Sequence, residues 1–276
     1  MSRLAAKFAV LKKEGRAAFV PFITAGDPDM ETSFAILEKL PGAGADIIEL
    51  GMPFTDPMAD GPAVQASSVR ALKSGASMTR VLEMVKKFRK TDKTTPIVLM
   101  GYYNPIHAYG TSRFAKDVAA AGVDGLIVVD LPLEEDEVLR LPAQAQGVDL
   151  VRFVTPTTDD TRLKRIVTEA SGYLYYVSVA GVTGTKAVPE DEVRAAMARV
   201  RSATGLPCTV GFGIRSKEQA EAIARLADGV VVGSAIVSMV ADNLGSGKDK
   251  IVNEVLALTR ALAGSTHAAR HGKVPV

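Results

Sequence analysis

Short apolar runs alternate with longer amphipathic segments along the whole of this 276-residue chain, and that alternation limits the folds open to it. Eight of the runs have the length and the β-branched and aromatic content of strands. They cover residues 18–24, 46–51, 96–102, 125–130, 148–154, 172–178, 207–213 and 229–233. The segments between them carry apolar residues at helical spacing, as over residues 30–40, 111–121, 159–170 and 216–227. Strands joined by helices in this way form a parallel sheet that is buried on both faces.

Eight strand–helix units predict an α/β fold, the closed (β/α)8 TIM barrel. The alternative is an open doubly wound sheet, which is disfavoured because no G-x-G-x-x-G follows the first strand run. Related phrases, GAGADII, AAGVDGLI and RLADGVV, precede three strands, as expected for a fold built from one repeated unit. No linker interrupts the pattern. We therefore expect a single barrel domain over residues 1–276, with an extra N-terminal helix over residues 1–16 and a poorly ordered tail over residues 264–276.

Composition disfavours several other classes of protein. The formal net charge is +2 and no basic block stands out, so a nucleic-acid partner is not expected. The most apolar stretch, residues 229–241, is shorter than the roughly 20 residues that span a bilayer. A single cysteine, Cys208, cannot form an intramolecular disulfide and suits a reducing compartment. We expect a cytoplasmic, soluble protein with no membrane partner.

A glutamate, Glu49, interrupts the second strand run within the stretch DIIELGMPFTDPMADGP. Side chains alternate along a strand, so Glu49 shares a face with Ile47, while Ile48 and Leu50 face the helices outside the barrel. Glu49 then points into the barrel near the carboxyl ends of the strands, where barrel enzymes place their chemistry. Burial there would raise its pKa toward that of a general acid or base at neutral pH. The alternative is a structural ion pair in the barrel interior.

Two aspartates follow in a loop that three prolines shape, Pro53, Pro57 and Pro62. From there Asp60 can approach a substrate from above and accept a hydrogen bond from an N–H or O–H group. Aspartate equally often caps a turn of its own backbone, and the residues alone leave both interpretations of Asp60 open. For Asp56 the pattern favours a turn or a surface contact.

Glycine-rich segments follow three late strands, at residues 180–186, 211–216 and 232–237. Barrels of this kind often bind phosphate at these loops. The backbone N–H groups of Gly233 and Ser234 would open a short helix, where unpaired amides and the helix dipole favour a dianion. Gly213 lets the main chain approach the phosphate closely. The sequence therefore predicts a phosphate site at this rim.

The residue types that are missing narrow the chemistry further. There are three histidines, His107, His267 and His271, and two of them lie in the expected tail, so no histidine-based metal site is expected. No lysine lies within a strand run where a Schiff-base nucleophile would stand. What remains is cofactor-free acid–base chemistry by carboxylates, helped by tyrosine.

Aromatic and apolar residues at similar depths on several strands predict a flat pocket for an aromatic group, although each of them could equally serve ordinary core packing. They are Phe22, Met100, Tyr102, Ile127, Phe153, Tyr173, Tyr175 and Phe212.

Five motifs, taken in order, resemble those of the tryptophan synthase α subunit family. They are FITAGDP (22–28), IELGMPFTDPMADGPAVQ (48–65), GYYNP (101–105), GVTGT (181–185) and GFGI (211–214). The resemblance runs from about Phe19 to the Gly-Ser pair at 233–234. It implies a (β/α)8 barrel that cleaves indole-3-glycerol phosphate by a retro-aldol reaction into indole and glyceraldehyde 3-phosphate.

The resemblance also implies roles for single residues. Glu49 matches the general acid and base that protonates indole C3 and takes the proton of the glycerol hydroxyl. Asp60 matches the carboxylate that engages the indole N–H, Tyr175 a tyrosine near the reacting carbons, and Thr183 a residue of a loop that closes over the site. Phosphate-binding positions are matched by Gly184, Gly213, Gly233 and Ser234, and lining positions of the indole pocket by Phe22, Met100, Ile127 and Phe212.

Members of the family need no cofactor of their own and pair with a pyridoxal-phosphate β subunit, usually as an α2β2 complex. The Asp56 loop and residues 101–105 would face that partner. This chain carries Val179 where many relatives carry arginine, which bears on loop closure and signalling between subunits. The loops at 53–60 and 179–190 combine Gly, Pro and Thr with few apolar anchors, so we expect both to be mobile without ligand.

Two other functions stay open beside this one. The first is another phosphosugar barrel enzyme, an isomerase or epimerase, that shares the phosphate rim and uses different acid–base residues. The second is a barrel that binds a phosphorylated metabolite without converting it and acts as an effector of its partner.

Overall fold

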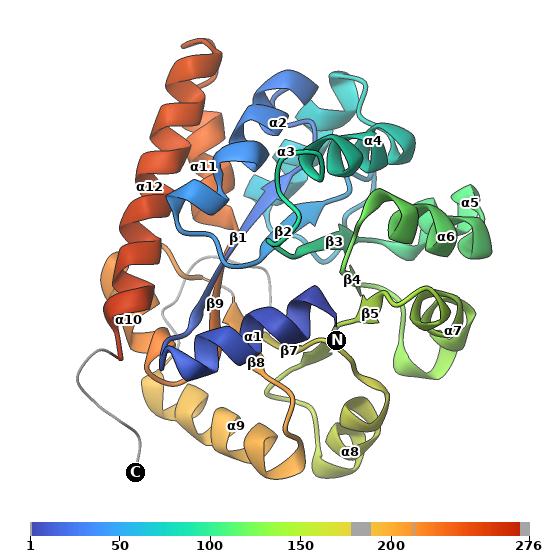
Figure 1. Cartoon of the computed structure of the whole chain (residues 1–276), viewed down its shortest axis with the longest axis vertical. Helices are drawn as coiled ribbons and strands as arrows, with labels where there is room; N and C mark the ends of the chain where they lie inside the picture. The colour runs from blue at the N-terminus through green and yellow to red at the C-terminus, as the bar shows by residue number, and fades with distance from the viewer. Residues whose placement is uncertain (1, 178–188, 212, 271–276) are drawn as a thin grey trace.

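A parallel sheet rolled into a barrel forms the centre of the molecule, in the computed structural model that describes residues 2–177, 189–211 and 213–270 (Figure 1). Its strands follow the order β5-β4-β3-β2-β1-β9-β8-β7-β6. Their bounds are β1 Ala18–Thr24, β2 Ile48–Gly51, β3 Ile97–Gly101, β4 Gly125–Val128, β5 Asp149–Leu150, β6 Arg152–Val154, β7 Leu174–Val177, β8 Cys208–Gly211 and β9 Gly229–Val232. The prediction of a (β/α)8 barrel is confirmed.

The barrel closes through its fifth strand, which the structure divides in two. Segments β5 and β6 stand at opposite ends of the strand order, and only Val151 separates them along the chain. β5 pairs with β4 and β6 pairs with β7, while the Val151 N–H donates to the carbonyl of Leu126 at 3.0 Å. The nine segments are therefore eight strands in space, as the eight apolar runs predict.

Twelve α-helices lie in the described part of the chain, most of them outside the barrel (Figure 1). Side chains of Ser2, Asp29, Ser77, Asp159 and Ser216 cap five of these helices by accepting a backbone N–H of the first turn. The helices are α1 Arg3–Lys13, α2 Met30–Lys39, α3 Pro62–Lys73, α4 Met78–Phe88, α5 Tyr103–Tyr109, α6 Thr111–Ala121, α7 Glu137–Ala145, α8 Asp160–Glu169, α9 Glu190–Ala203, α10 Lys217–Ala224, α11 Ser234–Asp242 and α12 Lys248–Ala268.

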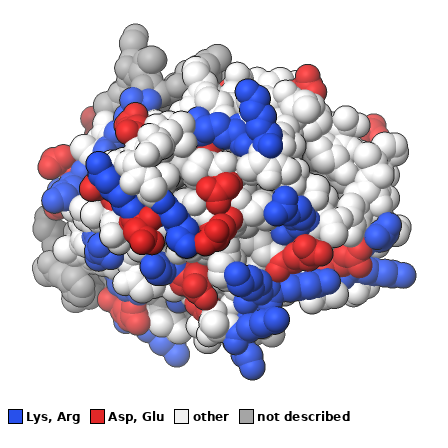
Figure 2. All heavy atoms as spheres, turned by 90° about the horizontal axis from the view of Figure 1, so that it is seen from above, with Lys and Arg blue, Asp and Glu red and all other residues white. Residues whose placement is uncertain are grey.

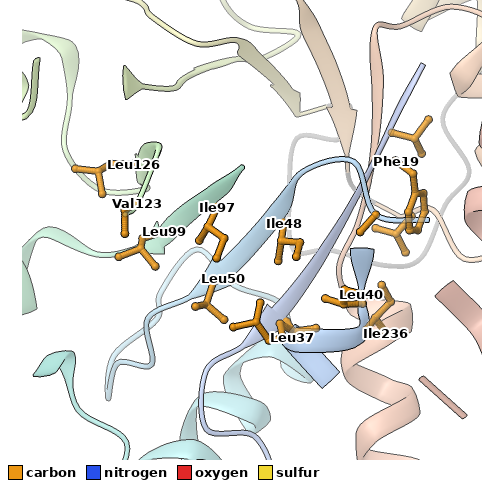
Figure 3. Close-up of a cluster of buried hydrophobic side chains, with 14 of the residues drawn as sticks. Phe19, Leu37, Leu40, Ile48, Leu50, Ile97, Leu99, Val123, Leu126 and Ile236 are labelled. Carbon is orange, nitrogen blue, oxygen red and sulfur yellow. The ribbon is translucent and has the colours of Figure 1, made fainter. Parts of the chain in front are cut away.

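The larger part of the core lies between the outer face of the barrel and the helices. Ile48 and Leu50 belong to this cluster, together with Leu37 and Leu40 at the end of α2 (Figure 3). Because neighbouring residues of a strand point to opposite faces, Glu49 between them is directed into the barrel.

The N-terminal helix α1 closes the barrel interior at the amino-terminal ends of the strands. Its residues Leu4, Phe8 and Leu11 are buried in one cluster with inward-facing strand residues, which include Ala18, Val20, Ile47, Val98, Ile127, Val151 and Tyr173. Arg3 pairs with Asp124 at 2.7 Å, just before β4, and the Ser2 hydroxyl donates to Asp149 at 2.9 Å. Apolar contact and these polar bonds together fix α1 on that end of the barrel.

Helix α12 continues through Ala268. The sequence analysis expected a poorly ordered tail from residue 264, but residues 264–268 are helical. Thr266 is fully buried, and the His267 Nε2 atom lies 2.8 Å from the Asp46 carboxylate. The Arg270 guanidinium donates to the carbonyl of Ala224 at 2.7 Å. These contacts hold the segment to the barrel, and residues 271–276 lie outside the described residues.

Charged side chains of both signs stand side by side on the face seen from above in Figure 2, without a large patch of one sign. In the described part of the chain, no helix combines the length and the apolar composition that crossing a membrane requires.

Candidate active site

A cavity opens at the carboxyl ends of the strands, at the end of the barrel opposite α1. It encloses about 540 Å³, including the part open to solvent. Strands β1, β2, β3, β7 and β9, the loops that follow β8 and β9, and the first turns of α3 and α11 form its wall. Its lining residues are Phe22, Glu49, Asp60, Gly61, Val64, Met100, Tyr175, Gly213, Ile214, Val231, Gly233 and Ser234.

The Glu49 carboxyl is fully buried in this wall. The Tyr173 hydroxyl donates to its Oε1 atom at 2.8 Å, while Oε2 has no hydrogen-bond partner among the described residues. Burial raises the pKa of Glu49 to about 8, and the bond from Tyr173 only partly opposes that effect. Within the described chain no cation pairs with this carboxyl, so the ion-pair alternative finds no support there. Glu49 is therefore largely neutral at pH 7, and Oε2 is the oxygen left to carry its proton.

Asp60 lies across the cavity from the strands, in the turn that leads into α3. Its backbone N–H donates to the carbonyl of Pro57 at 3.0 Å, and Pro62 starts the helix two residues later. Burial raises the pKa of Asp60 to about 6, against a hydrogen bond from the Tyr102 hydroxyl that lowers it. The same Tyr102 oxygen accepts the backbone N–H of Ala59 at 3.1 Å. Tyr102 thus ties both the turn and its carboxylate to the barrel.

Replacing Tyr102 with phenylalanine is expected to raise the pKa of Asp60 above its value of about 6, because the carboxylate loses a hydrogen bond that favours its charged form. Carbon-13 NMR titration of labelled aspartates measures this change. Tyr103→Phe is the matched control, since the hydroxyl of that neighbouring tyrosine lies 3.1 Å from the Thr111 hydroxyl instead. An unchanged Asp60 titration in Tyr102→Phe would contradict the assignment.

Asp56 lies at the exposed side of the same loop. Its carboxylate accepts the hydroxyl of its neighbour Thr55, and its carbonyl accepts the N–H of Met58 at 2.9 Å. It does not line the cavity. These local bonds agree with the turn interpretation of Asp56.

Two tyrosines stand beside Glu49, Tyr173 just before β7 and Tyr175 within it. Tyr175 lines the cavity, and its ring packs edge-on against Phe153 with centroids 5.3 Å apart. A side chain at Gly211 would overlap the Tyr175 hydroxyl, so glycine at that position leaves room for it. Burial and the nearby Glu49 carboxyl raise the pKa of both Tyr173 and Tyr175 well above the usual value, which keeps both phenols neutral.

Glycine and a helix start form the opposite end of the cavity. Gly213 has a φ of +80°, a left-handed conformation that side chains rarely adopt. Gly233 precedes α11, and its carbonyl accepts the N–H groups of Ile236 and Val237. The N–H groups of the first helical turn have no acceptor within the helix, so Ser234 and its neighbour present amides where a dianion would be favoured.

The sequence-predicted residues thus fall into three groups. Eight line the cavity, namely Phe22, Glu49, Asp60, Met100, Tyr175, Gly213, Gly233 and Ser234. Three do not line it. Tyr102 hydrogen-bonds to the Asp60 turn, Tyr173 hydrogen-bonds to Glu49, and Ile127 is fully buried in the barrel interior. Thr183, Gly184 and Phe212, together with Val179, lie outside the described residues, and so does most of the loop at 179–190.

Four lining residues were not predicted from the sequence. Val231 alternates with Val230 and Val232, so the period of two along β9 could have found it. Ile214 stands in the GFGI motif beside Gly213. Gly61 and Val64 belong to the start of α3, and no sequence pattern indicates that this helix begins at the cavity.

The two carboxyls are suited to different tasks at neutral pH. Glu49, with a pKa of about 8, holds a proton that it can donate, whereas Asp60, with a pKa of about 6, is mostly ionised and can accept an N–H or stabilise positive charge. Pairs of titratable groups whose surroundings separate their pKa values are typical of acid–base catalysis. On the same cavity, Gly213 and the start of α11 offer the backbone amides that a phosphate group favours.

Comparison with known proteins points to one family. The family model for the tryptophan synthase alpha chain matches residues 8–267. The chain is similar to the solved tryptophan synthase subunit alpha from Legionella pneumophila str. Paris, with 39% identity, a TM-score of 0.90, and coverage of 96% of this chain and 98% of that one. It is also similar to tryptophan synthase from M. tuberculosis in its aminoacrylate-bound form, with 32% identity, a TM-score of 0.86, and coverage of 97% and 100%.

Proposed function

The chain belongs to the tryptophan synthase alpha chain family, and we propose that Glu49 and Asp60 share the chemistry of its reaction. That reaction is the retro-aldol cleavage of indole-3-glycerol phosphate to indole and glyceraldehyde 3-phosphate, a carbon–carbon lyase step of tryptophan biosynthesis. The observation that carries the proposal is the pairing of a neutral, buried Glu49 with an ionised Asp60 on one cavity.

Glu49 acts first as the acid. Its neutral carboxyl donates a proton to indole C3, which converts the ring into a cation whose positive charge extends to the ring nitrogen. The Asp60 carboxylate accepts the indole N–H and stabilises that charge. Both tasks suit the protonation states at pH 7, because one pKa lies above and the other below that value.

Glu49 then acts as the base. Its carboxylate takes the proton of the glycerol hydroxyl next to the ring, the carbon–carbon bond breaks, and the electron pair of that bond returns to the indole ring. One product is neutral indole and the other an aldehyde, and Glu49 regains the proton that it gave. Tyr175 stands beside the reacting carbons with a neutral phenol.

The remaining site residues divide between the two ends of the substrate. Phe22 and Met100 contact the indole ring, while Tyr102 and Tyr173 hold the Asp60 and Glu49 carboxyls. Ile127 lies deeper in the barrel interior. Gly213, Gly233 and Ser234 bind the phosphate through backbone amides and a helix N-terminus. Gly184 and Thr183, outside the described residues, are assigned to phosphate binding and to loop closure because they match the family motif.

The family implies a tryptophan synthase complex, and we propose its form. The partner is a β subunit that holds pyridoxal phosphate and receives the indole, in an α2β2 heterotetramer within the cytoplasm. The α chain itself uses no cofactor, since proton transfer by Glu49 and charge stabilisation by Asp60 suffice for its step. Met58, which is 74% exposed beside Asp56, gives the loop an apolar contact for that partner.

Indole release from indole-3-glycerol phosphate tests the function directly. Purified chain is assayed alone and with a β subunit, and indole is measured by its absorbance or by its conversion to tryptophan. We expect release in both cases. An isomerase or epimerase would consume the substrate without producing indole, and an effector barrel would leave it unchanged, so absence of indole in both assays would overturn the proposal.

A further inference from the structure

Helix α3 brings one wall of the cavity into place, although little apolar contact holds it. Asp60 and Gly61 immediately precede it and Val64 lies in its first turn, and all three line the cavity. Its buried residues are two serines and one alanine, Ser67, Ser68 and Ala71. By contrast, α4 buries Val81, Leu82, Met84, Val85 and Phe88. Hydrophobic packing, which usually fixes a helix on a barrel, is therefore weak at α3.

Polar contacts take its place along one face of the helix. Ser67, Arg70 and Ser74 follow each other at spacings of three and four residues, so they share a face. Each of the three bonds to the segment at the end of β1, which follows the cavity residue Phe22. We call these contacts the α3 clamp. On the helix it consists of Ser67, Arg70 and Ser74, which contact Thr24, Asp27 and Gly26 respectively at the end of β1.

The first contact of the clamp is buried and has a defined direction. The Thr24 and Ser67 hydroxyl oxygens lie 2.6 Å apart, and both residues are buried. Ser67 also lies 2.7 Å from the carbonyl of Val64, to which it donates. A hydroxyl has one proton, so Ser67 must accept from Thr24. The chain of bonds therefore leads from the end of β1 to the backbone of a cavity residue.

The second contact is a two-pronged ion pair. The Arg70 Nε and a terminal guanidinium nitrogen donate to the two carboxylate oxygens of Asp27 at 2.6 and 2.8 Å. The Asp27 side chain is only 3% exposed and that of Arg70 is 20% exposed. A pair of this geometry fixes orientation as well as distance. Among the described residues Arg70 is the only ion-pair partner of the buried Asp27. Burial raises the pKa of the Asp27 carboxyl even with Arg70 present.

The third contact fixes the turn itself. The Ser74 hydroxyl lies 2.9 Å from the carbonyl of Gly26 and 2.8 Å from that of Ala71, so its one proton is shared between the two. The Gly26 N–H donates to the Ser33 hydroxyl of α2 at 2.8 Å. Gly26 has a φ of +90°, and a Cβ there would lie 2.8 Å from Ala76. The turn after β1 is thus held from two sides, which makes it a firm base for α3.

We propose that Arg70, acting through Asp27, is a positioning residue for the indole end of the site. The α3 clamp sets the distance between Phe22 on β1 and the Asp60–Val64 wall, where the indole ring of the proposed substrate lies. This inference rests on the proposed function for the identity of the ligand. The phosphate end should depend on it less. Helix α11 packs against α3, but its buried residues Ile236, Val237 and Val240 and its contacts with β1 and α12 anchor it as well.

Two binding probes distinguish positioning from a merely structural role. Indole-3-propanol phosphate, which lacks the hydroxyl needed for cleavage, reports on both ends of the site, and glycerol 3-phosphate reports on the phosphate end alone. For Arg70→Met we expect the Kd of the indole probe to rise about tenfold and kcat to fall about 10- to 100-fold, as small misplacements do. The Kd of glycerol 3-phosphate should stay within about twofold. Arg70→Lys should recover part of the loss.

Arg89→Met serves as the matched control. Arg89 forms a similarly buried pair with Asp124, 10% and 3% exposed, at the amino-terminal ends of the strands and away from the cavity. The Arg89→Met substitution should lower the free energy of unfolding and leave the Kd values of both probes unchanged. Folding of each variant is checked by circular dichroism and urea unfolding. If Arg70→Met does not fold, Ser67→Ala, which removes the hydroxyl link to Val64, carries the same expectation with a smaller rise for the indole probe.

Either of two results would overturn the clamp. One is a folded Arg70→Met, or a folded Ser67→Ala in its place, that binds both probes like the wild type. The other is an Arg89→Met control with the same selective loss as the α3 variants. Failure of the wild-type chain to bind the indole probe would instead contradict the proposed function, so the two failures are distinguishable.

Discussion

Glu49→Gln is expected to lower kcat for indole release by about 10²- to 10⁴-fold, the usual range for a positioned acid–base group. The amide keeps nearly the shape of the carboxyl. Its oxygen can still accept the hydrogen bond of the Tyr173 hydroxyl, which lies 2.8 Å from Oε1 of Glu49 in the wild type. The amide cannot, however, donate a proton to indole C3 and take one back. The Kd of indole-3-propanol phosphate should therefore stay within a few-fold of the wild type. Steady-state assays and calorimetric titration measure the two quantities.

Glu38→Gln on α2 is the control for this change, because it makes the same substitution at an exposed position. It should leave both kcat and Kd unchanged. Full activity of Glu49→Gln in the complex would contradict the assignment of Glu49 and would favour a barrel that acts only as an effector. Parallel loss of kcat and of affinity would instead mean that Glu49 binds substrate rather than transferring protons.

The barrel could be predicted from the sequence because each parallel strand is buried on both faces and therefore reads as an apolar run. The same pattern predicts the direction of Glu49, since Ile48 and Leu50 pack against the helices and leave the residue between them inside. The end of α12 could not be predicted in this way. Its last turns are held by His267 and Arg270 through polar contacts to distant parts of the chain, which no local pattern reveals.

In the candidate site, too, local sequence patterns predicted some residues, while others depend on contacts between distant parts of the chain. Strand residues such as Phe22 and Met100 follow the period of two and were found at the cavity. Ile127 also faces inward, but it is buried in the interior with α1, because alternation gives the face of a residue and not its height in the barrel. The roles of Tyr102 and Tyr173 depend on hydrogen bonds to the Ala59 backbone and to the Glu49 carboxyl, across 43 and 124 residues. Such contacts, like those of the α3 clamp, exist only in the folded chain.

Glu49 should also make the stability of the protein depend on pH. Its pKa is about 8 in the folded protein and 4.5 for an unperturbed glutamate, so folding favours the neutral carboxyl. The stabilisation of that form is complete below about pH 4.5 and is lost as pH rises to about 8, where the buried group must ionise. At about 1.4 kcal/mol for each pKa unit, the loss is on the order of 5 kcal/mol.

Glu49→Gln has no carboxyl to ionise, so its free energy of unfolding should rise relative to the wild type between pH 5 and pH 9, by several kcal/mol. Urea unfolding of both proteins at pH 5, 7 and 9 measures the difference, in which the contributions of all other groups largely cancel. Asp60→Asn is the comparison, because the pKa of Asp60 rises only from 3.8 to about 6. The difference in stability between Asp60→Asn and the wild type should therefore stop growing above about pH 6.

Parallel stability curves for Glu49→Gln and the wild type would show that Glu49 is not desolvated in the folded protein. The expected divergence has a further meaning. A neutral residue at position 49 would fold better above pH 7 than the glutamate does, so folding alone gives no reason for a carboxyl there. Proton transfer does, because the same desolvation that destabilises the folded chain holds the pKa of Glu49 close to the pH at which it must donate and accept.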